Sequence, residues 1–149
     1  CMNNTFNHAD PIEHEHKVWW ATVYCDTERR IAFFNFLDTG VGILESINIK
    51  LSESLLRMVG IRNNADLMRD VLEGKIGSRT RLHYRGNGLP EIIKRFKMEQ
   101  FSRLIIISNN VYADLEKDEY RVLAKPLDGT FFHWEISYDK HYIPGEADD

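Results

Sequence analysis

The chain has 149 residues, 43% hydrophobic and 28% charged, with a net charge of −4. This length predicts one domain with a substantial core. The acidic balance argues against non-specific nucleic-acid binding, which needs an excess of Lys and Arg. No apolar run approaches the roughly 20 residues of a membrane helix, and no signal peptide is evident, so we expect a cytoplasmic protein without a membrane segment.

The cysteines and the first residue add two expectations. Two cysteines are too few for a disulfide framework, and there is no Cys-x-x-Cys pair. Cys25 lies in an apolar stretch and is expected to be buried, as a small hydrophobic residue would be. Because the sequence begins with Cys1, we expect a single domain over residues 1–149 that is incomplete at its N-terminus.

The first half of the chain predicts a β-hairpin followed by short helices. Residues 18–26 and 31–38 are rich in β-branched and aromatic residues and are separated by a short polar link, which is typical of paired strands. Residues 52–60 and 63–75 are expected to be helical. Residues of capping type flank both helices: Ser52 and Asn64 as N-caps, and Gly60 and Gly74 as stops.

The second half predicts one helix and three strands. Residues 89–99 form an amphipathic pattern with a Pro in the first turn. Strands are expected over 103–108, 119–127 and 129–138, the last two joined by a turn at Asp128-Gly129.

This order of elements predicts an α+β fold. Strands that follow one another through short turns are antiparallel, and the intervening helices must cover one face of the sheet. We therefore expect a two-layer α/β sandwich with a mostly antiparallel sheet. The segment 75–88 is rich in Gly and Arg and predicts a mobile loop, and the tail 139–149 is expected to be frayed.

The sequence "DTGVG" at the end of the second strand suggests a binding pocket. Alternation places Phe34, Phe36 and Asp38 on one face of the strand. A carboxylate at the end of an apolar row is costly to bury unless it accepts hydrogen bonds. Gly40 and Gly42 allow close approach to the main chain. The alternative, an ordinary strand end followed by a turn, is equally compatible with this stretch alone.

A second glycine pair precedes the helix at 89–99. Gly86 and Gly88 lie where free N–H groups and the helix dipole favour an anion such as phosphate, with Arg85 beside them. No Gly-Lys-Ser/Thr follows, so this is not a P-loop, and the pair does not closely follow a strand as a Rossmann fingerprint does. The alternative for this pair alone is a plain loop with an N-cap.

Taken in order, four stretches resemble the motifs of the GHKL ATPases. "NNTFNHA" resembles the end of the Asn box, "DTGVGI" the first glycine box, "RGNGL" the second, and "DGTFF" the late Gly-Thr element. The superfamily includes DNA gyrase B, the ninety-kilodalton heat-shock chaperone, MutL and sensor histidine kinases, and the likeness is nearest to the histidine-kinase type. It covers nearly the whole chain and implies a Bergerat-type ATP-binding fold.

The resemblance implies a site for ATP and Mg²⁺. Asp38 matches the residue that accepts from the adenine amino group, and Asn4 matches the Mg²⁺ ligand. His8 lies one helical turn after Asn4. Residues 48–85 match the lid over ATP. The remaining matches lie in the boxes that line the nucleotide: Gly40, Gly42, Arg85, Gly86, Gly88, Leu89 and Thr130.

The implied function is that of an ATP-binding domain in a histidine-kinase-like signalling protein, serving ATP hydrolysis or phosphotransfer. The Glu that opens the family's Asn box, and is the hydrolytic base in some members, would precede Cys1. No catalytic residue is therefore assigned. The alternative is a nucleotide-gated interaction module with little or no turnover. Either one implies a protein partner or an attached signalling domain.

Two other patterns have simpler interpretations. His14 and His16 lie in a polar loop without a third ligand at a fitting spacing, so a solvated loop is favoured over a metal site. The many aromatic residues of the strands favour a core rather than a surface that stacks RNA bases, given the acidic balance. Ser102, Ser108 and His133 are expected to be ordinary strand or loop residues.

Overall fold

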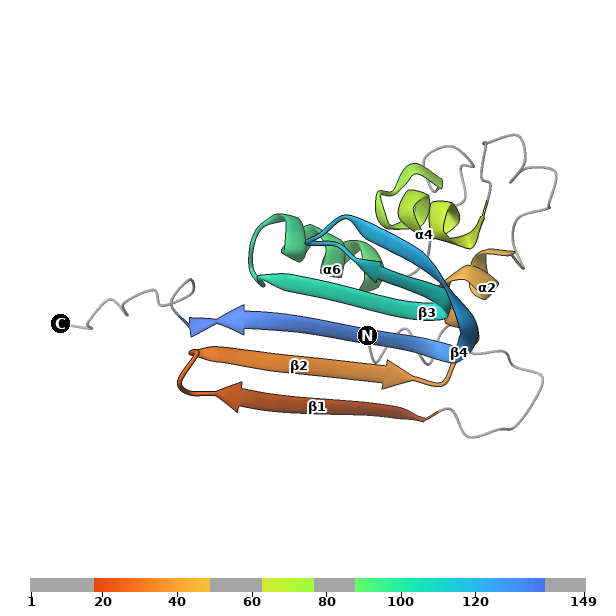
Figure 1. Ribbon diagram of the computed structural model, residues 1–149. Helices are drawn as coiled ribbons and strands as arrows, with labels where there is room; N and C mark the ends of the chain where they lie inside the picture. The colour runs from red at the N-terminus through yellow and green to blue at the C-terminus, as the bar shows by residue number, and fades with distance from the viewer. Residues whose placement is uncertain (1–17, 49–62, 77–87, 139–149) are drawn as a thin grey trace.

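The computed structural model describes residues 18–48, 63–76 and 88–138. Within them, a four-stranded antiparallel sheet in the order β1-β2-β4-β3 is accompanied by three helices (Figure 1). The strands are β1 (Trp19–Asp26), β2 (Ile31–Asp38), β3 (Arg103–Asp114) and β4 (Glu119–Ser137), and the helices are α2 (Gly42–Asn48), α4 (Asn64–Leu72) and α6 (Gly88–Lys97). The predicted α+β class is confirmed, and the arrangement is compatible with a two-layer sandwich.

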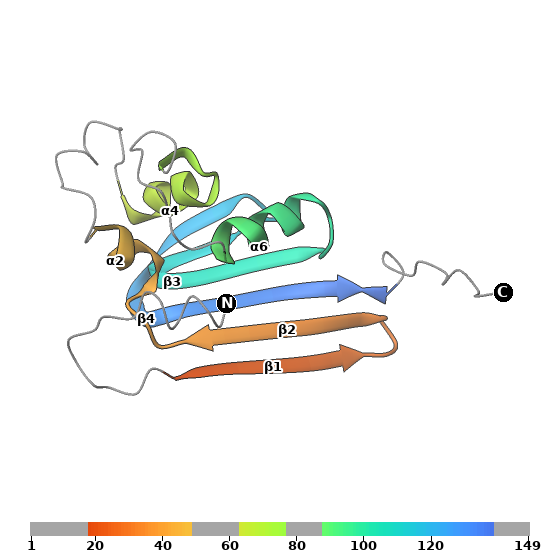
Figure 2. The same ribbon diagram turned by 180° about the vertical axis from the view of Figure 1, so that it is seen from behind.

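The helices lie on one face of the sheet, as the view from behind shows (Figure 2). Alternate residues of β2 are buried on this face, namely Ala32, Phe36 and Asp38. The core is formed by aliphatic residues of the helices and of β3 together with two Phe residues of the sheet: Ile43, Leu44, Ile47, Leu67, Met68, Leu72, Ile93, Leu104, Ile106, Val111, Phe36 and Phe132. Phe34 stacks on Trp134 of β4 at 5.4 Å between ring centroids.

The β1–β2 hairpin agrees with the prediction from the sequence. Its strands are paired from Trp19 opposite Asp38 to Asp26 opposite Ile31, and β2 begins and ends at the predicted residues. The prediction for Cys25 is wrong, because this residue is exposed. The reason is that β1 is an edge strand with no described helix over it, so an apolar strand does not imply a covered one.

The predicted turn at Asp128-Gly129 is wrong. β4 runs unbroken through both residues, and β3 continues to Asp114 instead of ending at Ser108. The hairpin turn lies at Leu115–Asp118 instead, where the Asp114 carboxylate accepts from the N–H of Lys117 at 3.3 Å. Register shifts around Asn109 bend this long hairpin. Two predicted strands are therefore one, and the described part of the sheet has four strands.

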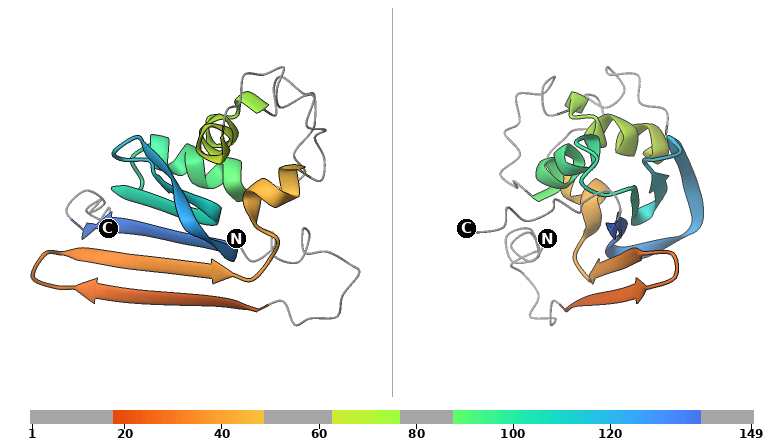
Figure 3. Two further views of the ribbon diagram at one scale, coloured as in Figure 1. Left: turned by 45° about the vertical axis from the view of Figure 1, so that its right-hand side comes forward. Right: turned by 90° about the vertical axis from the view of Figure 1, so that its left-hand side faces the viewer.

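The distal part of the β3–β4 hairpin leaves the sheet as a ribbon and packs against α4 (Figure 3). Arg69 of α4 forms an ion pair with Asp118 at 2.9 Å and lies over the ring of Tyr120. Asn64 donates to the side chain of Asn110 at 2.7 Å. The ribbon thus fixes α4 at both ends, which a short hairpin turn could not do.

The helices α4 and α6 begin close to the predicted positions, whereas α2 was not predicted. α6 starts one residue before the predicted helix, and Gly74 after α4 has a φ of 76°, as its predicted role as a stop requires. The N-cap of α4 is Asn63 rather than Asn64, and its side chain accepts from the N–H groups of Ala65 and Asp66. The predicted helix at 52–60 lies outside the described residues, as do most of the predicted loop 75–88 and the tail.

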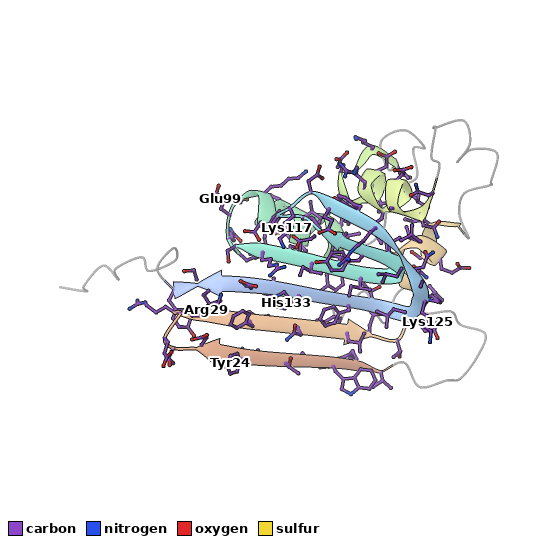
Figure 4. All side chains as sticks on the ribbon, in the orientation of Figure 1. Tyr24, Arg29, Glu99, Lys117, Lys125 and His133 are labelled. Carbon is purple, nitrogen blue, oxygen red and sulfur yellow. The ribbon has the colours of Figure 1, made fainter. Side chains whose placement is uncertain are left out.

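None of the described helices is long and apolar enough to cross a membrane. The sheet face opposite the helices carries polar side chains that are bonded to one another across the strands. The hydrogen bonds and ion pairs run from Thr22 through Asn35, His133, Glu135 and Arg103 to Asp114. His133 lies on β4, as labelled in Figure 4. On the described residues, this face is a sheet surface that no described helix covers.

The core predicts one measurement. Ile106 is fully buried opposite Phe132, so Ile106→Ala should lower the free energy of unfolding by about 2–5 kcal/mol through lost burial and the cavity left behind. Val122→Ala is the control, because Val122 is half-exposed and should change stability by no more than about 0.5 kcal/mol. Urea unfolding measures both, and equal losses would contradict this placement of the core.

Candidate functional site

The site is built around Asp38, the last residue of β2. Its side chain is buried, with the residue 9% exposed, and it lies opposite Thr130 of β4. One carboxylate oxygen, Oδ1, accepts from the N–H of Gly40 at 3.0 Å. The segments "DTGVG" and "DGTFF", far apart in the sequence, thus meet at one end of the sheet.

Burial raises the pKa of the Asp38 carboxyl, because the charged form is poorly solvated there. The main-chain N–H groups of Gly40 and Thr130 act in the opposite direction, since they hydrogen-bond to the charged form, but burial is the larger effect. In its ionised form, this carboxylate accepts hydrogen bonds and donates none.

Gly129 allows the two strands to meet so closely. Its φ is 126°, and a Cβ atom at this position would lie 1.8 Å from the main-chain oxygen of Asp38. No other residue fits there without moving β2 or β4. The Asp-Gly pair that predicted a turn is therefore required for close contact between strands.

Ser108 joins three segments at this end of the sheet. The fully buried hydroxyl accepts from the N–H of Ile43 at 2.8 Å and lies 3.1 Å from both the main-chain oxygen of Gly129 and the hydroxyl of Thr130. Ser108 is a strand residue, as expected, but its partners come from segments that no local pattern connects.

Asn109 completes the attachment of α2 to β3. Its side-chain oxygen accepts from the N–H of Leu44 at 3.0 Å, and its amide donates to the main-chain oxygen of Val41 at 2.9 Å. A Cβ atom on Gly42, whose φ is 80°, would lie 2.5 Å from the Asn109 side chain. Glycine at position 42 is therefore explained by this contact and by its positive φ.

The sequence contained one signal for Ser108 and Asn109, which is that polar residues end an apolar run. "RLIIIS" is followed by two Asn residues, and polar side chains at the end of a buried strand need partners. The pattern shows that partners exist but not which ones they are.

The second glycine box is described only in part. Gly88 begins α6, and Leu89 lines an apolar cavity of about 540 Å³ between α4 and α6, with Lys94 and Lys97 among its described lining residues. Asp38 and Thr130 are not among the described residues of that lining. Within the part of the chain that the structure describes, the cavity and the Asp38 site are separate features.

Four of the expected site residues lie outside the described residues: Asn4, His8, Arg85 and Gly86. His14 and His16 lie there as well, as does most of the expected lid at 48–85. Among residues 18–48, 63–76 and 88–138, no group of three or more His, Cys, Asp or Glu side chains could hold a metal ion. The described site residues are thus Asp38, the first glycine box and Thr130, which meet at one end of the sheet, together with Gly88 and Leu89 of the second glycine box.

No family model, curated protein or solved structure matches the chain. The interpretation of the site therefore depends on its own geometry and chemistry.

The buried carboxyl predicts a pH-dependent difference between wild type and Asp38→Asn. Protonated Asp38 contributes stability that is fully present below the unfolded pKa, 3.8, and is lost as pH rises through the higher folded pKa. The amide of the variant does not titrate, so the stability of the variant relative to wild type should increase as pH rises from below 3.8 to neutral. Urea unfolding over a pH series measures this, and a difference that falls with pH would contradict the burial of the carboxyl.

Removing the Ser108 hydroxyl should destabilise the protein. Ser108→Ala leaves the buried N–H of Ile43 without its acceptor, at a cost of about 1–3 kcal/mol in the free energy of unfolding. Ser102→Ala is the matched control, because the Ser102 hydroxyl donates to the main-chain oxygen of Glu135, which the N–H of Ser102 also bonds. Thermal unfolding of both variants provides the comparison, and an equal loss at Ser102 would contradict the role of Ser108.

Proposed function

We propose that the chain is a GHKL-type ATP-binding domain of a histidine-kinase-like signalling protein. The Bergerat-type arrangement and the use of bound ATP for hydrolysis or phosphotransfer belong to the same proposal. One observation carries it: the buried carboxylate of Asp38 lies opposite Thr130, at the end of the sheet where the first glycine box follows β2. These are the two matched motifs that the described residues contain in full.

The chemistry of Asp38 suits the amino group of adenine. An ionised carboxylate accepts several hydrogen bonds and donates none. Oδ1 already accepts from Gly40, and the carboxylate retains further lone pairs for a ligand donor. Guanine presents a carbonyl oxygen where adenine presents its amino group, so a carboxylate here selects adenine by attraction and rejects guanine by repulsion.

The fixed position of Asp38 supports selectivity. The close contact at Gly129 holds the end of β2 against β4, and Ser108 and Asn109 hold the segment that follows Asp38. A carboxylate in such a site loses little conformational entropy when it binds a ligand. The residues present therefore fit the adenine end of ATP.

The proposal assigns the phosphate end to Gly86, Gly88 and Leu89, with Arg85 adding positive charge, and assigns Mg²⁺ to the side-chain oxygen of Asn4 with His8 nearby. The start of α6 at Gly88 supports the first assignment, because free N–H groups at a helix N-terminus stabilise an anion. Mg²⁺ would neutralise phosphate charge there.

Calorimetric titration with Mg-ADP and a non-hydrolysable ATP analogue tests the proposal. We expect saturable binding, with GDP bound much more weakly than ADP. Asp38→Asn should weaken ADP binding by at least about tenfold, because it removes a charge-assisted hydrogen bond worth about 1.5–3 kcal/mol. Asp128→Asn is the matched control, since Asp128 is exposed beside the site and should leave the affinity unchanged.

Folding is checked by the circular dichroism spectrum of each variant. Binding that Asp38→Asn leaves unchanged, or equal affinity for ADP and GDP, would contradict an adenine-selecting role for Asp38. No binding at all by the folded chain would contradict the proposed function.

A further inference from the structure

The outer edge of β1 has a defined set of hydrogen-bonding groups. The N–H of Thr39 donates to the main-chain oxygen of Val18 at 3.0 Å, so this pair is bonded toward β2. Bonding alternates along an antiparallel pair, so the even-numbered residues of β1 bond to β2. The N–H and C=O groups of the odd-numbered residues face away from the sheet, and no described strand pairs with them: Trp19, Ala21, Val23 and Cys25.

This edge lacks the features that usually prevent pairing. Edge strands are commonly protected by charged side chains, Pro, bulges or short length. From Trp19 to Cys25 the strand has no charged residue, Pro or Gly, and its eight residues pair with β2 without a bulge. Its side chains are also open to solvent, with Trp20 51%, Val23 61% and Tyr24 64% exposed.

We propose that β1 pairs with β1 of a second copy of this chain, antiparallel about a two-fold axis at Thr22, to form one continuous sheet across a dimer. The proposal is independent of nucleotide binding. A two-fold axis requires the same surface on both copies, and an uncharged strand is compatible with itself.

One register satisfies the whole edge. With Thr22 opposite Thr22 of the second copy, Trp19 lies opposite Cys25 and Ala21 opposite Val23, in both directions. Every outward-facing N–H and C=O of these four residues then has a partner. A shift by two residues along the strand would leave some of these groups unpaired.

The same register gives favourable side-chain pairs. On the face without described helices, Trp20 lies opposite Tyr24 of the second copy, and the two Thr22 residues face each other. Aromatic pairs and Thr–Thr pairs across strands are stabilising. Asp26 lies opposite Val18, so no like charges meet.

The network of polar side chains on the uncovered face, from Thr22 to Asp114, supports this axis. It begins at Thr22, whose hydroxyl accepts from the side chain of Asn35 at 3.1 Å. A hydroxyl that accepts one hydrogen bond still has a proton to donate. In the dimer, the polar networks of the two copies would meet at the paired Thr22 hydroxyls.

The first experiment is analytical ultracentrifugation of the 149-residue chain over a concentration series, with Ala21→Pro and Ala21→Ser. We expect wild type to reach twice the monomer mass of 17.5 kDa. Ala21→Pro should remain at the monomer mass, because it removes an outward N–H and no bond to β2. Ala21→Ser keeps the N–H and should remain dimeric. A wild-type monomer at every concentration, or an Ala21→Pro dimer, would overturn the proposal.

The second experiment tests the register even where Ala21→Pro fails to fold. In a background of Cys1→Ser and Cys25→Ser, Thr22→Cys places two thiols opposite each other at about 4.5 Å between Cα atoms, within disulfide range. Val23→Cys is the control, because its thiol lies opposite Ala21 of the second copy. Oxidation should link Thr22→Cys chains efficiently and Val23→Cys chains poorly. Equal linkage, or none in either variant, would overturn the register and the proposal.

Discussion

Ser108 of β3 lies where three segments of the chain meet, and its buried hydroxyl is bonded to the other two. It accepts from the start of α2 and contacts Gly129 and Thr130 of β4, while Ser108 itself belongs to β3. Asn109 extends the attachment to both sides of Gly42. Without these bonds, the N-terminal groups of α2 would be buried and unpaired, which is costly. The position of Asp38 depends on this attachment, because the segment after it leads directly into α2.

The ribbon formed by the ends of β3 and β4 has a second consequence. It holds α4 through Arg69 and Asn64, and α4 belongs to the range expected to act as a lid. Any lid movement that included α4 would have to break an ion pair, a hydrogen bond and the contact between Arg69 and Tyr120. Arg103, at the start of β3, pairs with the fully buried Asp114 beside the turn and so holds the distal end of the ribbon against the start of that strand.

Local patterns were sufficient for β2, α6 and the α+β class, because alternation, a first-turn Pro and polar links report directly on backbone conformation. They were insufficient at Asp128-Gly129. An Asp-Gly pair indicates that a residue with positive φ is needed, but a turn and a close contact between strands need it equally. They also did not identify Ser108, because its partners follow from the packing of β3 against β4 and α2. Position 38 was identified, since an Asp that ends an apolar row is unusual in any fold.

The stability of the fold does not explain Asp38. Burial disfavours the ionised form of its side chain and raises its pKa, so an ionised Asp38 is destabilising at the end of β2. The contact at Gly129 involves the main chain of residue 38. Among the described residues, the side chain bonds to N–H groups that a neutral acceptor could satisfy in part. Buried groups with perturbed pKa values cluster at functional sites, where the cost is offset by what they bind. A ligand donor, such as the amino group of adenine, would offset it here, because only an ionised carboxylate combines full acceptor capacity with a charge.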